Sequence, residues 1–182
     1  MRLRSQIGDE EIQDVRLGTS SAAPGLLVHH RPQRGLQGKF SMEFCVAAAI
    51  LYGEVRITTF IDDVAADPRL VALIEKMHPV IDPAVADSTE HAVIITARTA
   101  ANTYTERVDL ATGKPDRWMP EADIRRKFTD CAERMLTAAD ANRLYELLRT
   151  GADTHLEQVR ALLGGGAGRA GGKPELTGTV AR

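Results

Sequence analysis

The feature of this sequence that most constrains the fold is an apolar, alanine-rich run. Nearly every residue from Met42 to Leu51 is apolar. Ser41, in front of the run, is a preferred helix N-cap, and Gly53, behind it, suits the left-handed residue that commonly follows a helix. Because a helix of this composition has almost no polar face, we expect it to be buried, with other elements packed around it.

Segments with strand patterns lie on both sides of that run in the sequence. Apolar and polar residues nearly alternate from Ile12 to Leu17, which predicts a half-buried strand. The β-branched segments His91–Ala97 and Tyr104–Leu110 are separated by a short turn and predict an antiparallel hairpin. Glu54–Phe60 is typical of a short strand or an extended connector. These segments together predict an antiparallel or mixed sheet.

Amphipathic helical patterns make up much of the remaining sequence. One helix is expected to open at Asp67-Pro68, a second to have Pro120 as its first residue, and two shorter ones to follow the caps Thr137 and either Asp153 or Thr154. The apolar stripes of the two longer helices are Leu70, Val71, Ile74 and Met77, and then Ile124, Phe128, Cys131 and Met135. The predicted fold class is therefore α+β, with a sheet packed against the buried helix and further amphipathic helices around them.

Two glycine-rich stretches indicate where regular structure stops. Gly18–Gly38 is rich in Gly, Pro, Ser and Arg and predicts a long loop of the kind that carries function. From Gly164 the sequence is too glycine-rich to bury enough apolar surface to offset the entropy of ordering. We therefore expect one α+β domain over 1–163 and a disordered tail over 164–182.

Charge and cysteine content exclude several classes of function. Lys and Arg number 23 against 25 Asp and Glu, and a net charge of -2 does not favour nucleic acid or an anionic membrane as a partner. Cys45 and Cys131 lie in apolar helical runs without metal-ligand spacing, so we expect reduced core residues and no metal site. The longest apolar stretch, Val46–Leu51, is too short to span a bilayer, and the first residues lack the apolar segment of a signal peptide. A cytoplasmic location follows.

The segment Arg31–Gly53, with Lys39-Phe40-Ser41 at its centre, resembles the start of the core of the second domain in the MmgE/PrpD family. This is the family of 2-methylcitrate dehydratase and cis-aconitate decarboxylase. The likeness covers roughly residues 10–163 and continues in order along the chain: Phe60 to Asp62, the Asp67-Pro68 helix start, the two strands, a Gly-containing loop, and Ile124-x-x-Lys127-Phe128.

The resemblance implies a two-domain enzyme with the active site between a large helical N-terminal domain and a small α+β C-terminal domain. This chain matches only the C-terminal domain, and the catalytic lysine and histidine motifs of the N-terminal domain have no counterpart in it. The implied activity is that of a lyase, which removes water or carbon dioxide from a tricarboxylic acid without a metal or another cofactor. We expect the chain to be incomplete as a catalyst alone, to pair with the missing helical domain or a separate subunit, and to form a homodimer.

One position departs from the family pattern. Some relatives have a tyrosine where Phe44 stands, three residues after Ser41. Phenylalanine cannot donate a hydrogen bond or a proton, so this branch uses other chemistry or another residue takes that role. No catalytic residue is assigned from the sequence.

The candidate substrate-binding residues are Lys39, Ser41, Arg31, Arg34 and His30. Ser41 and the amides of the helix after it form a potential anion site, to which Lys39 adds charge. The arginines suit carboxylates, and a histidine titrates near neutral pH. The alternatives are that Ser41 only caps its helix and that the loop cations are only solvated.

Two other functions stay open at this point. The chain is alternatively a non-catalytic carboxylate-binding or dimerisation module that retains the fold, as Phe44 and the absent catalytic motifs suggest. The third alternative is an unrelated α+β domain that shares the helix motif by chance.

Overall fold

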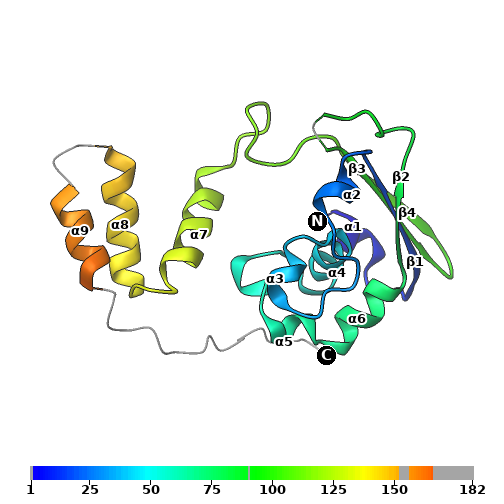
Figure 1. The fold of residues 1–182 in the computed structure, drawn as a ribbon, viewed down its shortest axis with the longest axis horizontal. Coiled ribbons are helices and arrows are strands. Elements are labelled where there is room, and N and C mark those ends of the chain that lie inside the picture. The colour runs from blue at the N-terminus through cyan, green and yellow to red at the C-terminus, as the bar shows by residue number, and fades with distance from the viewer. Residues whose placement is uncertain (1, 90, 152–155, 166–182) are drawn as a thin grey trace. The chain divides into compact units, whose positions relative to one another are not determined.

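The computed structural model describes residues 2–89, 91–151 and 156–165, which divide into two compact units, Met1–Met119 (unit 1) and Pro120–Arg182 (unit 2) (Figure 1). The fold class is α+β, as predicted. Unit 1 contains α1 (Arg2–Ile7), β1 (Ile12–Thr19), α2 (Ala23–Leu26), α3 (Gly35–Gly38), α4 (Met42–Tyr52), η1 (Ile57–Thr59), α5 (Asp62–Ala65), α6 (Pro68–Glu75), β2 (Met77–Ile81), β3 (Val93–Thr99) and β4 (Thr103–Val108). Unit 2 contains α7 (Glu121–Ala132), α8 (Ala138–Thr150) and α9 (Leu156–Gly165).

The sheet of unit 1 is mixed and has the strand order β2-β1-β3-β4. β1 pairs in parallel with β2, with Val15 opposite Met77, and β3 pairs antiparallel with both β1 and β4. The β3–β4 pair confirms the predicted hairpin, with its strands starting and ending within about two residues of the expected positions. Figure 1 shows α1, α4 and α6 on one side of this sheet. Val15, Leu17 and Ile95 are buried beneath them.

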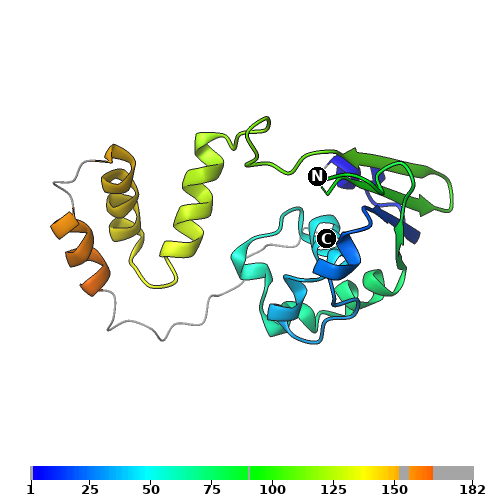
Figure 2. The ribbon, with the colours of Figure 1, turned by 45° about the horizontal axis from the view of Figure 1, so that its top comes forward.

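Helix α4 confirms the central expectation from the sequence. It packs against α1, α3, α6 and β2, and Figure 2 shows it among the other helices of unit 1. Phe44, Ala47 and Ala48 have no exposed surface. The helix ends at Tyr52, and Gly53 caps it with a φ of +85°, the left-handed conformation that glycine adopts most readily.

Helix α6 begins as predicted but is shorter than its apolar stripe suggested. The Asp67 side chain caps it by accepting a hydrogen bond from the N–H of Arg69. The helix ends at Glu75, and Met77 opens β2, a strand that the sequence did not predict. Only Met77 of β2 is buried. Pro79 fits there because β2 lies at the edge of the sheet, where a missing N–H breaks no ladder.

The long segment after β1 is more structured than a loop. β1 continues to Thr19, and the short helices α2 and α3 interrupt the rest. Gly35 of α3 lies against the backbone of Phe60 and Ile61, where an added Cβ would come within 2.4 Å of main-chain atoms. The segment Glu54–Phe60 is a connector with the short helix η1 and not a strand.

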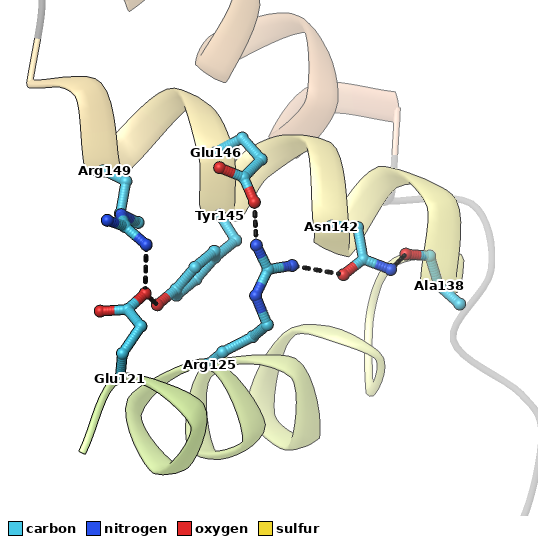
Figure 3. Close-up of polar contacts among 7 residues, drawn as sticks. All are labelled: Glu121, Arg125, Ala138, Asn142, Tyr145, Glu146 and Arg149. Atoms are coloured by element: carbon cyan, nitrogen blue, oxygen red, sulfur yellow. Dashed lines mark hydrogen bonds and ion pairs between the residues drawn. The ribbon is translucent and has the colours of Figure 1, made fainter. Parts of the chain in front are cut away.

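Unit 2 is built around a pair of helices joined by polar contacts (Figure 3). Arg125 of α7 lies over the ring of Tyr145 of α8, 4.5 Å from its centroid, and also donates hydrogen bonds to Asn142 and Glu146. Glu121 of α7 accepts hydrogen bonds from the Tyr145 hydroxyl and from Arg149. The polar side chains therefore carry much of the contact between α7 and α8.

Several predictions for unit 2 were wrong in detail. Pro120 is the N-cap of α7 and not its first helical residue. Cys131 is exposed and is not a core residue. None of the twelve residues of α7, all within the described part of the chain, is buried. Thr137 caps α8 as predicted.

The end of the domain is only partly described. α9 continues to Gly165, so regular structure extends past the predicted start of the tail at Gly164. The candidate caps Asp153 and Thr154 and the rest of the tail lie outside the described residues. A single domain over 1–163 stays a prediction.

Candidate functional site

The first turn of α4 is where the predicted site residues concentrate. Ser41 has an extended backbone, and its hydroxyl accepts a hydrogen bond from the N–H of Phe44 at 3.1 Å. This confirms the capping role that the sequence left open. Ser41 has no exposed surface. Its contact with a substrate stays a prediction, and such contact would require the surrounding chain to open.

Glu43 is the one acidic residue of this helix, and its carboxylate is buried. Its side chain is only 4% exposed, its Oε1 lies 2.8 Å from Nδ1 of His30, and its Oε2 lies 3.4 Å from the hydroxyl of Ser41. Burying an ionised carboxylate is costly unless it has charged or hydrogen-bonding partners, and negative charge is favoured in the first turn of a helix. Glu43 therefore already occupies the positive end of α4, where an anionic ligand had been expected.

His30 connects this buried acid to the surface. Its side chain is 62% exposed although its Nδ1 contacts Glu43. The N–H of His29 donates to the carbonyl oxygen of Phe40 at 3.1 Å, so the two chain segments lie side by side at the start of α4. This backbone hydrogen bond brings residue 30 near the Lys39 segment.

Lys39 is exposed, and its Nζ lies 5.7 Å from the centre of the Phe60 ring. That ring stacks on Phe44, with the centroids 5.8 Å apart. A cation above an aromatic face is weakly attracted to it while keeping its water. Lys39 is thus held near the start of α4 with its charge available to a ligand.

Arg31 and Arg34 are also exposed. Their segment is fixed by Gln37, whose side-chain oxygen accepts hydrogen bonds from the N–H groups of Gln33 and Arg34. Gly35 N–H donates to Asp62, which ties α3 to α5. The structure thus orders the backbone of both arginines, but it does not bring their guanidinium groups into the described contacts around Glu43.

The sequence profile of the MmgE/PrpD C-terminal domain matches residues 1–150. The chain belongs to the MmgE/PrpD family. No curated protein matches it. The family match confirms the resemblance carried by Arg31–Gly53, and it covers α7 and α8 of unit 2 as well as all of unit 1.

Within this MmgE/PrpD domain, Phe44 is a core residue. It has no exposed surface, and an added Cβ at Gly38 would come within 2.8 Å of its ring. Gly38 therefore allows α3 to pack closely on this ring. The position where some relatives have a tyrosine is thus filled here by an apolar side chain that supports the start of α4.

Two cavities of unit 1 lie elsewhere in the MmgE/PrpD domain. One, of about 350 Å³, lies between α1, the last turn of α4 and α6, and Arg4, Leu51 and Lys76 are among its lining residues. The other, of about 470 Å³, is lined by residues 83–88 together with Ala92, Arg107 and Asp109. Neither is lined by Lys39 or Ser41. The start of α4 combines a buried acid, the exposed His30 that contacts it, and the exposed Lys39, which precedes Ser41 by two positions.

Within the described residues, no group of three or more His, Cys, Asp or Glu side chains is placed to hold a metal ion. No helix in that part of the chain combines the length and apolar character needed to cross a membrane.

Sequence reasoning missed Glu43. The available signal was a single acidic residue in the first turn of an otherwise apolar helix, two positions after the cap. Such a residue must find a partner once the helix is buried, but the identity of the partner depends on how the segment before α3 folds back.

Proposed function

We propose that this chain is the C-terminal domain of an MmgE/PrpD-type lyase that acts on a tricarboxylic acid, by removal of water or carbon dioxide. Within it, His30 and Lys39, with Arg31 and Arg34 close in sequence, bind the carboxylates. The observation that carries the proposal is the exposed His30 held by buried Glu43 beside the Lys39 segment. Membership of the family supports the reaction class.

The chemistry of such an elimination explains why cations are needed. A base removes a proton next to a carboxylate, the electron pair forms a carbon–carbon double bond, and hydroxide leaves with a proton as water. In the decarboxylating variant, a carbon–carbon bond breaks, carbon dioxide leaves and a proton adds in its place. Negative charge accumulates on the substrate in either case, and fixed positive groups stabilise it. No cofactor is required by this scheme.

The base is not assigned to any residue of this chain. We propose that it comes from a helical N-terminal domain or from a separate subunit, so that the chain alone is incomplete as a catalyst. The cytoplasmic location and a homodimeric assembly belong to the same proposal.

The proposal is tested with the purified 182-residue chain, citrate and NMR. Citrate is expected to shift the resonances of His30 and Lys39, whereas acetate at the same concentration shifts them much less. Lys39→Gln should weaken citrate binding about tenfold, because a charge-assisted contact contributes about 1.4 kcal/mol or more. Lys127→Gln, an exposed position in α7, is the matched control and should change nothing.

Turnover is measured in the same samples. The chain alone should not convert 2-methylcitrate or cis-aconitate. Conversion by the chain alone would contradict its incompleteness, and the absence of any citrate shift near His30 and Lys39 would contradict the binding role.

The alternative, a non-catalytic carboxylate-binding or dimerisation module, is favoured by one observation. Four large apolar side chains from the end of α2 to the start of α4 are at least half exposed, namely Leu26, Val28, Leu36 and Phe40. Exposed apolar groups of this size often belong to an interface. Concentration-dependent association in sedimentation, lost in Leu36→Asp, would support that alternative, and a monomer that binds citrate would favour a ligand-binding role.

A further inference from the structure

Two histidine–carboxylate pairs in the described part of the chain have similarly exposed histidines but differently exposed carboxylates. His30 is 62% exposed and meets Glu43, whose side chain is 4% exposed. His78 is 61% exposed and meets Asp14, whose side chain is 33% exposed. Water competes for Asp14 much more than for Glu43, so only the first pair can strongly impose an arrangement on its histidine.

The two pairs also use different ring nitrogens. Glu43 contacts Nδ1 of His30 at 2.8 Å, whereas Asp14 contacts Nε2 of His78 at 3.1 Å. An ionised carboxylate only accepts hydrogen bonds, so the ring nitrogen that faces it must carry the proton. In a neutral ring the other nitrogen then has the free lone pair.

The carboxylate of Glu43 lies beside a hydrogen-bond donor and the partial positive charge of a helix start. It lies in the first turn of α4, whose unpaired N–H groups carry partial positive charge. The Ser41 hydroxyl lies 3.4 Å from its second oxygen. The carboxylate is therefore fixed on a buried helix, and its contact with Nδ1 fixes the orientation of the His30 ring.

We propose that Glu43 is a positioning residue that fixes neutral His30 in the Nδ1–H form and presents its Nε2 lone pair outward, as an acceptor for a hydroxyl group or a proton of the bound acid. The nature of the ligand rests on the proposed function. The tautomer and the orientation of the ring rest only on the contacts within the chain.

The first test uses the unmodified chain and long-range proton–nitrogen NMR spectra of the histidine rings at about pH 8.5, above the ordinary histidine pKa of about 6.5. His30 is expected in the Nδ1–H form, opposite to the Nε2–H form expected for His78. A predominant Nε2–H signal from His30 would overturn the proposal. This measurement needs no substitution, so it stands even if a variant fails to fold.

The second test compares Glu43→Gln with Asp14→Asn. The neutral amide of Glu43→Gln can donate or accept, so His30 should lose its preference and show a mixture of both tautomers. Asp14→Asn should leave the His30 signals unchanged. A folded Glu43→Gln chain with an unaltered His30 spectrum would refute the positioning role, since a merely structural Glu43 would not affect the tautomer.

Citrate binding separates this inference from the proposed function. If Glu43 positions His30 for the ligand, Glu43→Gln should reduce the citrate-induced shift of His30 severalfold while the shift at Lys39 persists. If citrate binds nowhere but His30 is in the Nδ1–H form, the proposed function fails and the positioning of the ring stands. If citrate binds and His30 is in the Nε2–H form, only the positioning role of Glu43 fails.

Discussion

The contacts that stabilise the inside of unit 1 differ from those that stabilise the inside of unit 2. In unit 1, a helix without a polar face is surrounded, and Phe44, Leu3 and Leu70 have no exposed surface. In unit 2, none of the described residues of α7 is buried, and α8 buries only Ala141, Leu144 and Tyr145. Burying one large apolar side chain contributes about 1.5–3 kcal/mol, whereas an exposed ion pair contributes about 0–1 kcal/mol. The comparison indicates that apolar burial specifies unit 1, whereas the α7–α8 contact combines a small apolar core with exposed polar pairs.

The largest effect is expected from Phe44→Ala in unit 1. Removing a ring that is fully buried and stacked on Phe60 leaves a cavity at the start of α4, and such truncations cost about 3–5 kcal/mol in the free energy of unfolding. Leu148→Ala in α8 is the matched control, because Leu148 is 53% exposed and its truncation should cost less than about 1 kcal/mol. Urea unfolding followed by circular dichroism measures both. Equal losses at the two positions would contradict the comparison.

A smaller effect in unit 1 is expected from Asp67→Ala. The Asp67 carboxylate accepts hydrogen bonds from the Arg69 N–H, the Arg69 guanidinium and, at 2.7 Å, the Tyr52 hydroxyl. Losing the helix cap and leaving the hydroxyl unpaired should cost about 2 kcal/mol. Asp63→Ala, at an exposed position in α5, serves as the control and should have little effect.

The same carboxylate gives this effect a dependence on pH. The hydrogen bonds from Arg69, together with that from Tyr52, hold the pKa of Asp67 well below its usual range. A carboxyl with a lowered folded-state pKa stabilises the fold fully above its unfolded pKa of about 3.9, and that stability is lost as the pH falls toward the folded value. The difference in the free energy of unfolding between the native chain and Asp67→Ala should thus be constant above about pH 5 and shrink below about pH 4. A stability difference that grows on acidification would contradict this prediction.

The sequence predicted the elements whose patterns are local. The composition of α4 required burial, and its caps Ser41 and Gly53 could be read directly. β2 was missed because Pro79 and four exposed positions hide an edge strand. The helix α7 was predicted from its spacing, but the same spacing also suggested burial of Cys131, which is exposed because few apolar groups cover that helix.

The local structure around the start of α4 was predicted in part for the same reason. The capping role of Ser41 follows from the helix start, because the N–H that it caps belongs to Phe44, three residues later. Lys39 lies near the ring of Phe60, which the pattern around the helix start does not predict. The contact between His30 and Glu43 joins residues thirteen positions apart across α3, and it depends on the glycines that let α3 pack against Phe44 and α5. Patterns within a short stretch of sequence do not show where the chain folds back and brings such residues together.

The smallest effect is expected in unit 2, from Arg125→Ala. Arg125 joins α7 to three side chains of α8 (Figure 3). Its neighbour Arg126 pairs instead with Asp123 of its own helix. Loss of the cation–ring contact and partly exposed polar contacts should cost about 1 kcal/mol, and Arg126→Ala should cost less than about 0.5 kcal/mol. Hydrogen exchange of the α8 amides measures both.

Salt distinguishes this effect from lost packing. At 1 M salt the screening length falls to about 3 Å, so the charge-dependent part of the Arg125 effect should weaken while the effect of Phe44→Ala should not. If the protection of α8 is the same in Arg125→Ala and Arg126→Ala at low salt, polar pairing does not hold the two helices together. The packing of Phe128 on Tyr145, whose ring centroids are 5.2 Å apart, would then be the main contact, and unit 2 would differ from unit 1 only in the size of its apolar core.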